Sequence, residues 1–296
     1  MRLKIVVPVI LIFITGACSS NQSNQANMEK GNQPAENKMD SSSGYAPVNG
    51  IQLYYEIHGE GKPLVMIHGG GSTIRTSFSQ LLPLLAKQYR VIAVELQAHG
   101  HTKDRDTASS FVQDADDVAA LLSYLKIDSA SFLGFSNGGH TLIEMGLRHP
   151  QIIHKLVIIS SFYSRDAAFK GFFEGMDHAT LETMPKPLRD AYLAIPGNDS
   201  AGLVRMFNQD KNRMIRFKGW EEKDIASINA PAFIINGTED VGSVENSLKM
   251  SRLMPHATLM ILPGTHGSFI GEICAAVPGS RMPEATVTAI EEFLNK

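Results

Sequence analysis

Residues 132–140 read FLGFSNGGH, and this stretch decides the fold. An apolar run ends at Phe135, Ser136 follows between Gly134 and Gly138, and a helical pattern begins at once. Small residues on both sides of a serine allow a tight strand–turn–helix connection that exposes its hydroxyl. A glycine-rich turn without any chemistry would have the same letters. Ser136 is therefore a candidate nucleophile that needs support from the rest of the chain.

The remainder of the chain alternates short apolar runs with helical patterns, which predicts an α/β fold with a mostly parallel central sheet flanked by helices. The apolar runs are nearly continuous, as in strands that are buried on both faces. Apolar residues spaced by three and four mark the helices, and Ser243 is a candidate N-cap. We expect strands at residues 52–58, 64–68, 91–95, 131–135, 156–160, 232–236 and 258–262. We expect helices at residues 77–88, 110–126, 138–150, 243–254 and 284–296.

One segment interrupts this alternation. Residues 162–225 are rich in Phe, Met, Pro and charged residues, with helical stretches and no convincing strand. A connection of this length is usually functional or has a structure of its own. We predict a helical lid at 162–225, inserted into a core of residues 45–161 and 226–296.

A serine hydroxyl is a weak nucleophile, so it needs a histidine base and an acid that orients the histidine. Asp240 follows a predicted strand in NGTEDVGS, and His266 follows the last predicted strand in LPGTHGSF. Ligands of open α/β sheets gather at the carboxyl ends of strands, and the chain order is the one expected for a serine, an acid and a histidine. We expect Ser136, Asp240 and His266 to form a catalytic triad, with Glu239 as the competing acid.

Acyl transfer also needs hydrogen-bond donors for the oxyanion of the transition state. The stretch IHGGGST directly follows a predicted strand, and its glycines leave backbone N–H groups unobstructed. We assign the backbone N–H groups of Gly70 and Asn137 as the two donors of an oxyanion hole. For the glycines taken alone, a flexible turn is the alternative.

The segments HGGG, GFSNGG, NGTED and GTHG, in this order and after predicted strands, resemble those of the α/β-hydrolase superfamily. The resemblance covers residues 45–296, implies an inserted lid and favours Asp240 over Glu239. The stretch VELQAHGHT resembles the D-x-R-G-x-G-x-S segment of a lid-bearing branch that includes aminopeptidases, enol-lactonases, esterases and carbon–carbon bond hydrolases. Glu95 and Gln97 replace the usual Asp and Arg, which limits what the branch implies about the substrate.

The N-terminus has the pattern of an export signal. MRLKIVVPVILIFITGACSS places basic residues before an apolar run that is too short to span a bilayer stably. TGAC resembles the lipobox of bacterial lipoproteins, whose cysteine is lipidated, although Thr15 replaces the usual leucine. We expect a signal peptide at 1–17, a lipid anchor at Cys18 and a flexible tether at 18–44, hence a lipoprotein of a bacterial cell envelope. A simple cleaved signal would instead give a periplasmic or secreted protein.

Composition excludes several kinds of partner. Of the 296 residues, 43% are hydrophobic and 19% are charged, which suits one sizeable globular domain. The formal net charge of −3 provides no electrostatic footprint for nucleic acid and no polybasic patch. We therefore expect a small-molecule acyl substrate, no nucleic acid, and membrane contact only through the lipid anchor.

We expect neither a metal nor another cofactor. The spacing of His68, His99, His101 and His140 matches no recognised metal motif, and His68 is expected to order the oxyanion loop. Apolar side chains of the predicted lid are candidates for an acyl pocket or for the core of the lid. The candidate substrate contacts are Gly71, Phe169, Phe172, Phe173 and Met176.

The sequence thus predicts a serine hydrolase that cleaves a small ester, lactone or related acyl compound through an acyl-enzyme. One alternative is an aminopeptidase similar to proline iminopeptidase, in which Glu174, Asp177 and Glu182 would hold the substrate amine. Another, from a different class, is a non-catalytic binding protein that keeps the fold.

Overall fold

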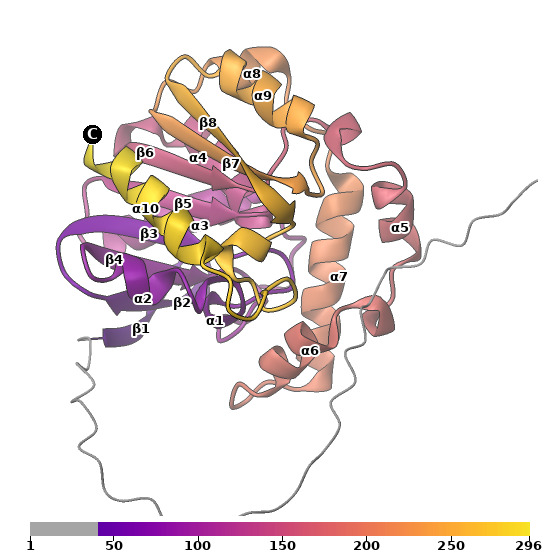
Figure 1. Cartoon of the computed structure of the whole chain (residues 1–296). Coiled ribbons are helices and arrows are strands. Elements are labelled where there is room, and N and C mark those ends of the chain that lie inside the picture. Colours follow the sequence, from indigo (N-terminus) through magenta and orange to yellow (C-terminus); the bar gives the residue numbers. More distant parts are fainter. Residues whose placement is uncertain (1–40) are drawn as a thin grey trace, which may run out of the picture. The chain divides into compact units, whose positions relative to one another are not determined.

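A computed structural model describes residues 41–296, which form an 8-stranded sheet covered by helices (Figure 1). The strand order is β1-β2-β4-β3-β5-β6-β7-β8. β2 runs antiparallel to both of its neighbours, and the other pairs are parallel. The strands are β1 (Ser41–Val48), β2 (Ile51–His58), β3 (Lys62–Ile67), β4 (Tyr89–Glu95), β5 (Ala130–Phe135), β6 (Ile153–Ile159), β7 (Ala232–Glu239) and β8 (Ala257–Thr265). The predicted α/β fold with a mostly parallel sheet is confirmed.

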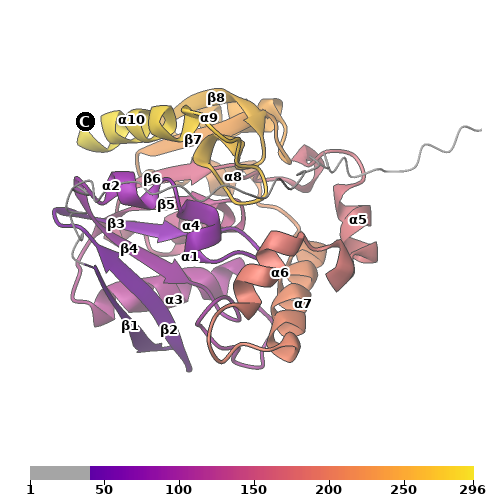
Figure 2. The ribbon, with the colours of Figure 1, turned by 60° about the horizontal axis from the view of Figure 1, so that its bottom comes forward.

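Helices cover both faces of the sheet because successive side chains of the central strands point into two apolar layers. Val65 and Ile67 of β3 face one layer, whereas Leu64 and Met66 face the other. The first layer contains α3 (Phe111–Tyr124), α4 (Asn137–Arg148), α8 (Glu222–Ala226) and α9 (Val244–Leu253). The second contains α1 (Ile74–Phe78), α2 (Leu82–Leu85) and α10 (Met282–Asn295). Figure 2 shows α10 and α3 on opposite sides of the sheet.

Local sequence explains where helices begin. Ser243 caps α9 as predicted, because its side chain accepts from Asn246 N at 3.2 Å. The single helix predicted at 77–88 is instead two short helices, α1 and α2. Pro83 lies in the first turn of α2, where its missing N–H costs nothing, and it cannot continue a helix that started earlier.

The structure adds a strand that the sequence analysis did not predict. β1 pairs with β2 from Ser41 opposite His58 to Val48 opposite Ile51. Residues 41–44, which we assigned to the tether, therefore belong to the sheet. Their polar composition suggested a coil, but hydrogen bonds of the backbone ladder hold them at the sheet edge.

Residues 162–225, called the inserted segment below, contain helices and no strand. Three of its helices, α5 (Phe172–His178), α6 (Lys186–Leu193) and α7 (Ser200–Arg216), lie together beside the sheet (Figure 1). Apolar clusters hold them, one around Met184, Leu188 and Met206 and another around Phe162, Phe173, Met214 and Phe217. The last helix of the segment, α8, packs on the sheet through Ile225.

The predicted signal peptide at 1–17, the lipid anchor at Cys18 and residues 18–40 of the tether lie outside the described residues. Within residues 41–296, no helix is both long and apolar enough to cross a membrane.

Candidate active site

Ser136 lies at a sharp turn between β5 and α4. Its backbone angles, φ 54° and ψ −118°, are uncommon for a residue that has a Cβ. The turn is tight, because a Cβ on Gly134 would lie 2.3 Å from Gly138 O and one on Gly138 would lie 2.1 Å from Ile67 O. The two glycines of the G-x-S-x-G stretch therefore meet a steric requirement.

Ser136, His266 and Asp240 form a continuous line of hydrogen bonds. Ser136 Oγ lies 3.0 Å from His266 Nε2, and His266 Nδ1 lies 2.6 Å from Asp240 Oδ1. An ionised carboxylate only accepts, so Nδ1 carries the proton and Nε2 accepts from the Ser136 hydroxyl. The His266 side chain is 32% exposed, whereas that of Asp240 is fully buried at 0%. This geometry allows His266 to remove the hydroxyl proton of Ser136.

The Asp240 carboxylate is held by further donors. Burial acts to raise the pKa of Asp240, but the charge and hydrogen bond of His266 and the Ser160 hydroxyl lower it overall. Ser160 Oγ donates to Asp240 Oδ2 at 2.6 Å, and Gly237 N donates to the same oxygen at 3.1 Å. Glu239, the competing acid, is exposed. The acid that orients His266 is therefore Asp240.

The loop after β3 is fixed in place before it reaches Ser136. His68 Nδ1 donates to Gly69 O at 2.7 Å, and His68 Nε2 accepts from Leu96 N at 3.1 Å. Burial lowers the pKa of His68 to about 3, so the ring is neutral and has this one tautomer. Gly71 N donates to Asp210 Oδ2. His68 thus orders the loop, as the sequence predicted.

Two backbone N–H groups beside Ser136 are available to an oxyanion. Gly69 N donates to a serine hydroxyl and Gly71 N to a carboxylate, so both are occupied. Gly70 N and Asn137 N have no acceptor within residues 41–296. Both residues line the cavity in front of Ser136, as Gly71 does, and Asn137 N is at the first turn of α4, where N–H groups lack helical partners.

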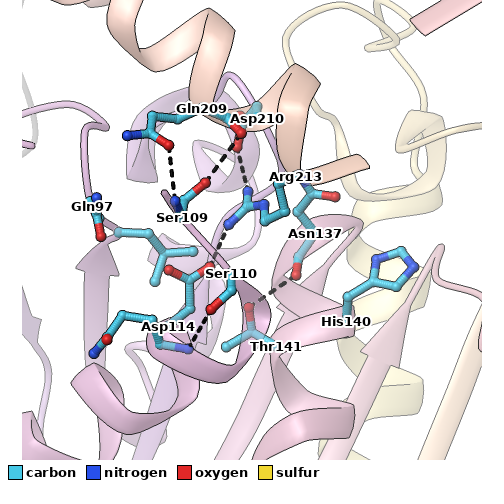
Figure 3. Close-up of polar contacts among 12 residues, drawn as sticks. Gln97, Ser109, Ser110, Asp114, Asn137, His140, Thr141, Gln209, Asp210 and Arg213 are labelled. Carbon is cyan, nitrogen blue, oxygen red and sulfur yellow. Dashed lines mark hydrogen bonds and ion pairs between the residues drawn. The ribbon is translucent and has the colours of Figure 1, made fainter. Parts of the chain in front are cut away.

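A second carboxylate, Asp210 of α7, reaches the same loop from the inserted segment. Figure 3 shows Asp210 beside Arg213, whose guanidinium also points to Asp114. Asp210 accepts from Gly71 N and from Arg213 Nη2, and its Oδ2 lies 2.8 Å from His99 Nε2. Arg213 Nη1 donates to Asp114 Oδ2 of α3 at 2.5 Å. These residues, called the Asp210 network below, join α7 to α3 and to the loops that follow β3 and β4.

The Asp210 network is charged but balanced. His99 Nδ1 lies 2.8 Å from Gln97 O, a carbonyl that only accepts, so both ring nitrogens donate and His99 is an imidazolium. Burial alone would lower the pKa of His99, but Asp210 raises it overall. Burial would likewise raise the pKa of Asp210, yet His99 and Arg213 bring it well below its usual range. Burial raises the pKa of Asp114 to about 6 in spite of Arg213.

A cavity of about 330 Å³ opens in front of Ser136 beneath the inserted segment. Phe172 and Met176, two predicted substrate contacts, line it. Phe169 and Phe173 do not, because Phe169 is 54% exposed and Phe173 packs inside an apolar cluster of the inserted segment. Apolar residues that the sequence analysis did not assign to the cavity complete its wall, among them Phe162, Met184, Leu188, Phe207, Met214 and Val241.

The acidic side chains that an aminopeptidase would need are not at this cavity. Glu174, Asp177 and Glu182 are exposed and do not line it. Among the described residues, the acidic side chain on its wall is Asp210, which is already paired with His99 and Arg213. A substrate amine therefore finds no unpaired carboxylate on this wall.

The remaining histidines of the predicted motifs have structural partners. His101 Nδ1 lies 2.8 Å from Glu95 Oε2, and the His140 ring stacks on Phe111. Burial lowers the pKa of His140 to about 3, which keeps it neutral. Within residues 41–296, no group of at least 3 His, Cys, Asp or Glu side chains is placed to hold a metal ion.

The two departures from the D-x-R-G-x-G-x-S pattern have local partners. Glu95 Oε2 also accepts from His101 N at 2.6 Å, which ties down the loop after β4. Gln97 Oε1 accepts from Arg105 Nη1 at 2.6 Å, and Arg105 Nη2 pairs with Asp117 at 2.5 Å. Arg105 thus places a guanidinium beside Gln97, where the pattern has an arginine of its own.

Asp210 and Arg213 were not identified from the sequence. They are three residues apart on α7, a spacing that oppositely charged pairs on solvent-exposed helix faces also adopt. Their burial follows from the packing of α7 against α3, which no local pattern reports. Ser160 was likewise taken only as the end of a strand.

Comparison with known proteins identifies the family of this chain. Residues 62–220 match the family described as alpha/beta hydrolase fold. The human serine hydrolase BPHL is 38% identical over 211 residues, which cover 67% of this chain and 70% of that protein. A pimeloyl-[acyl-carrier protein] methyl ester esterase from Photobacterium profundum is 32% identical over 140 residues, 47% of this chain and 52% of the esterase. The chain belongs to the α/β hydrolase fold family and is an enzyme of the hydrolase class.

Solved structures have the same fold. The enol-lactonase from Burkholderia xenovorans LB400 aligns with a TM-score of 0.65 at 21% identity, over 85% of this chain and 100% of that one. A meta-cleavage product hydrolase from Pseudomonas fluorescens IP01 aligns with a TM-score of 0.70 at 22% identity, over 86% of this chain and 97% of that one. At these identities the likeness shows the fold alone.

Proposed function

We propose that this chain is a serine hydrolase that cleaves a small ester, lactone or related acyl compound. The observation that carries the proposal is the line from Ser136 through His266 to Asp240, with separations of 3.0 Å and 2.6 Å, which opens onto a cavity of about 330 Å³. The wall of this cavity is mostly apolar and suits an acyl chain.

The first half-reaction transfers the acyl group to Ser136. The serine Oγ attacks the carbonyl carbon while His266 Nε2 takes the hydroxyl proton, and Asp240 holds the ring and stabilises the imidazolium. The charge that develops on the carbonyl oxygen is received by the N–H groups of Gly70 and Asn137. The carbon–oxygen bond to the leaving group then breaks, and the leaving oxygen takes the proton from His266.

The second half-reaction restores the enzyme. A water molecule attacks the acyl-enzyme while His266 again accepts a proton, and the bond to Ser136 Oγ breaks as the proton returns to that oxygen. The carboxylic acid leaves. The side chains named here, the substrate and water account for every proton and electron pair.

The direct test is hydrolysis of p-nitrophenyl esters of increasing acyl length by the full chain. We expect turnover with a length optimum, and Ser136→Ala should reduce it by several orders of magnitude without unfolding the protein. Ser123→Ala, which removes an exposed hydroxyl on α3, is the matched control and should behave as the wild type. Equal turnover in Ser136→Ala would contradict the proposal.

Fluorophosphonate labelling separates this proposal from a binding protein that has lost turnover. A competent nucleophile should be labelled in the wild type and not in Ser136→Ala. Labelling of Ser136 without ester turnover would direct the search to lactones. Absence of both would favour the binding protein.

We further propose that the chain is exported and anchored to a bacterial membrane through a lipid on Cys18. The basic residues, short apolar run and TGAC segment of the N-terminus support this proposal. Metabolic labelling with an alkyne fatty acid should mark the full chain and not Cys18→Ala. Labelling of both, or of neither, would contradict it.

A further inference from the structure

A second cavity, of about 280 Å³, lies against Ser136. The two cavities adjoin at Ser136, and the lining residues that they share are Gly70, Ser136, Pro185, Leu188 and His266. Its own wall includes Thr265 and Glu272, which come from β8 and from the chain that follows it. A substrate held at Ser136 therefore has room on two sides.

Glu272 differs from the other buried carboxylates of residues 41–296. Besides Asp240, whose side chain pairs with His266, the acidic residues that this part of the chain buries are Glu95, Asp114, Asp117 and Glu272. Glu95, Asp114 and Asp117 also contact basic side chains, namely His101, Arg213 and Arg105. Within the described range, Glu272 has no basic side chain at salt-bridge distance. A buried carboxylate without a cation is costly, so its position on a cavity wall beside the nucleophile calls for a partner from outside the chain.

The carboxylate is held firmly in this position. Glu272 is 6% exposed, and its Oε2 accepts from Cys274 N at 2.7 Å. Glu272 packs closely against Gly267, because a Cβ added to this glycine would lie only 2.8 Å from the Cβ of Glu272. Burial raises the pKa of Glu272 in spite of His266, and a bound cation would offset that effect.

The rest of this wall offers no competing charge. Burial and the nearby carboxylate raise the pKa of the Cys274 thiol to about 12, so it stays neutral. Among the residues that line the cavity, the ionisable side chains besides Glu272 and Cys274 are limited to His266. The second cavity thus presents one negative group to a ligand, whereas the carboxylate of the first cavity is already paired.

We propose that the second cavity is a leaving-group subsite in which Glu272 binds a protonated amine, so that the preferred substrates are esters of amino alcohols. This inference rests on the proposed serine hydrolase function. The leaving group belongs on this side because residues 265–275, the chain around His266, form part of this wall. His266 Nε2 must reach the leaving oxygen to protonate it. The apolar acyl chain occupies the first cavity.

In this reaction the carbon–oxygen bond of the ester breaks and its electron pair goes to the alcohol oxygen. That oxygen takes the proton that His266 removed from Ser136, and the amino alcohol leaves with its ammonium group unchanged. Glu272 takes no part in the proton transfer. It positions the leaving group by a charge-assisted hydrogen bond.

The test compares two esters of the same shape with the full-length protein at neutral pH. 2-(Dimethylamino)ethyl butyrate carries a protonated nitrogen where 3-methylbutyl butyrate carries a carbon. A charge-assisted hydrogen bond predicts that kcat/KM is about 10- to 100-fold higher for the amino ester. Equal values for the two esters would overturn the proposal, as would a preference for an amine placed on the acyl side instead.

Variants locate the preference. In Glu272→Gln, the ratio of the two kcat/KM values should fall to about one. Because both values are measured on the same variant, a general loss of activity does not affect their ratio. Glu245→Gln, an exposed residue of α9, is the matched control and should keep the wild-type ratio. If Glu272→Gln fails to fold, inhibition of the wild type decides: 2-(dimethylamino)ethanol should inhibit at lower concentration than 3-methylbutanol, and equal inhibition would overturn the proposal.

The failure of this proposal is distinct from failure of the proposed function. If the wild type hydrolyses p-nitrophenyl butyrate and hydrolyses the two test esters with equal kcat/KM, the subsite proposal is contradicted but the serine hydrolase proposal is not. No turnover of any ester, together with no fluorophosphonate labelling of Ser136, removes both.

Discussion

His266 and Asp210 both line the cavity at Ser136, and each belongs to an aspartate–histidine pair of similar geometry. His266 Nδ1 lies 2.6 Å from Asp240, and His99 Nε2 lies 2.8 Å from Asp210. The difference is at the second nitrogen of each ring. That of His266 faces the hydroxyl of Ser136, whereas that of His99 donates to a backbone carbonyl.

This difference separates a pair that can exchange a proton from one that cannot. The His266 side chain is 32% exposed, and the lone pair of its Nε2 faces the Ser136 hydroxyl. The His99 side chain is 2% exposed, and both of its ring nitrogens donate. Proximity of a carboxylate is therefore insufficient to identify a catalytic histidine. The partner of the distal nitrogen decides between chemistry and structure.

The largest effect is expected from removal of the exchanging ring. His266→Ala should reduce kcat by about 10⁵-fold, because the base and the acid of both half-reactions are lost. Free imidazole should restore part of the activity through the exposed cavity. His99→Ala provides the control, and restoration of its activity by imidazole would contradict the structural role of that ring.

The next effect is on stability. Asp210→Asn leaves the buried charge of His99 uncompensated and removes one of the two carboxylates that pair with Arg213. It should lower the free energy of unfolding by about 3 kcal/mol. Asp190→Asn is the matched control, since its pair with Lys186 is exposed and should contribute less than about 1 kcal/mol. Urea denaturation measures both. Equal losses would show that the Asp210 network does not stabilise the inserted segment.

The pair of Asp210 and His99 predicts that the free energy of unfolding depends on pH. The folded-state pKa of Asp210 is lowered, so its contribution to stability is present above the unfolded value of about 4 and is lost as the pH falls below it. The folded-state pKa of His99 is raised, so its contribution is present below about 6.5 and is lost as the pH rises through the folded value. The difference in unfolding free energy between wild type and Asp210→Asn should therefore shrink from pH 6 towards pH 3 and towards alkaline pH. A constant difference would contradict this assignment.

The smallest effect concerns the cavity that His266 and Asp210 line. Phe172→Ala enlarges the acyl side and should change the preference between neighbouring acyl lengths about tenfold in favour of the longer ester. Phe169→Ala removes an exposed ring outside the cavity and should leave the length profile unchanged. The chain-length series of p-nitrophenyl esters measures both, and a shift in Phe169→Ala alone would contradict the cavity described here.

The sequence analysis identified the pair of Asp240 and His266 but not the pair of Asp210 and His99. Ser136, Asp240 and His266 each follow a strand within a short local pattern, and parallel strands bring their carboxyl ends to one edge. Asp210 and Arg213 lie on a helix of the inserted segment, where their side chains are indistinguishable from solvated charges until α7 packs on α3. Glu272 was missed for the same reason, because its burial depends on the chain returning against Gly267 beside His266.

The strands of the sheet likewise divide into those that a local sequence pattern predicts and one that it does not. The buried parallel strands were predicted because continuous apolar runs are unusual outside such sheets. β1 was not, since Ser41–Val48 is a sheet-edge strand held by its backbone ladder, and its first residues are polar. Phe169 and Phe173 were wrongly predicted to line the cavity. The sequence pattern does not distinguish aromatic residues that face a substrate from those in the core of the inserted segment or at its surface.

The most direct test of this account is a comparison of Asp240→Asn with Asp210→Asn in p-nitrophenyl butyrate hydrolysis and in urea denaturation. We predict that Asp240→Asn reduces kcat by about 10⁴-fold, because the His266 tautomer is no longer fixed. Asp210→Asn should reduce kcat far less and lose stability instead. A loss of turnover in Asp210→Asn that equals or exceeds the loss in Asp240→Asn would contradict the account.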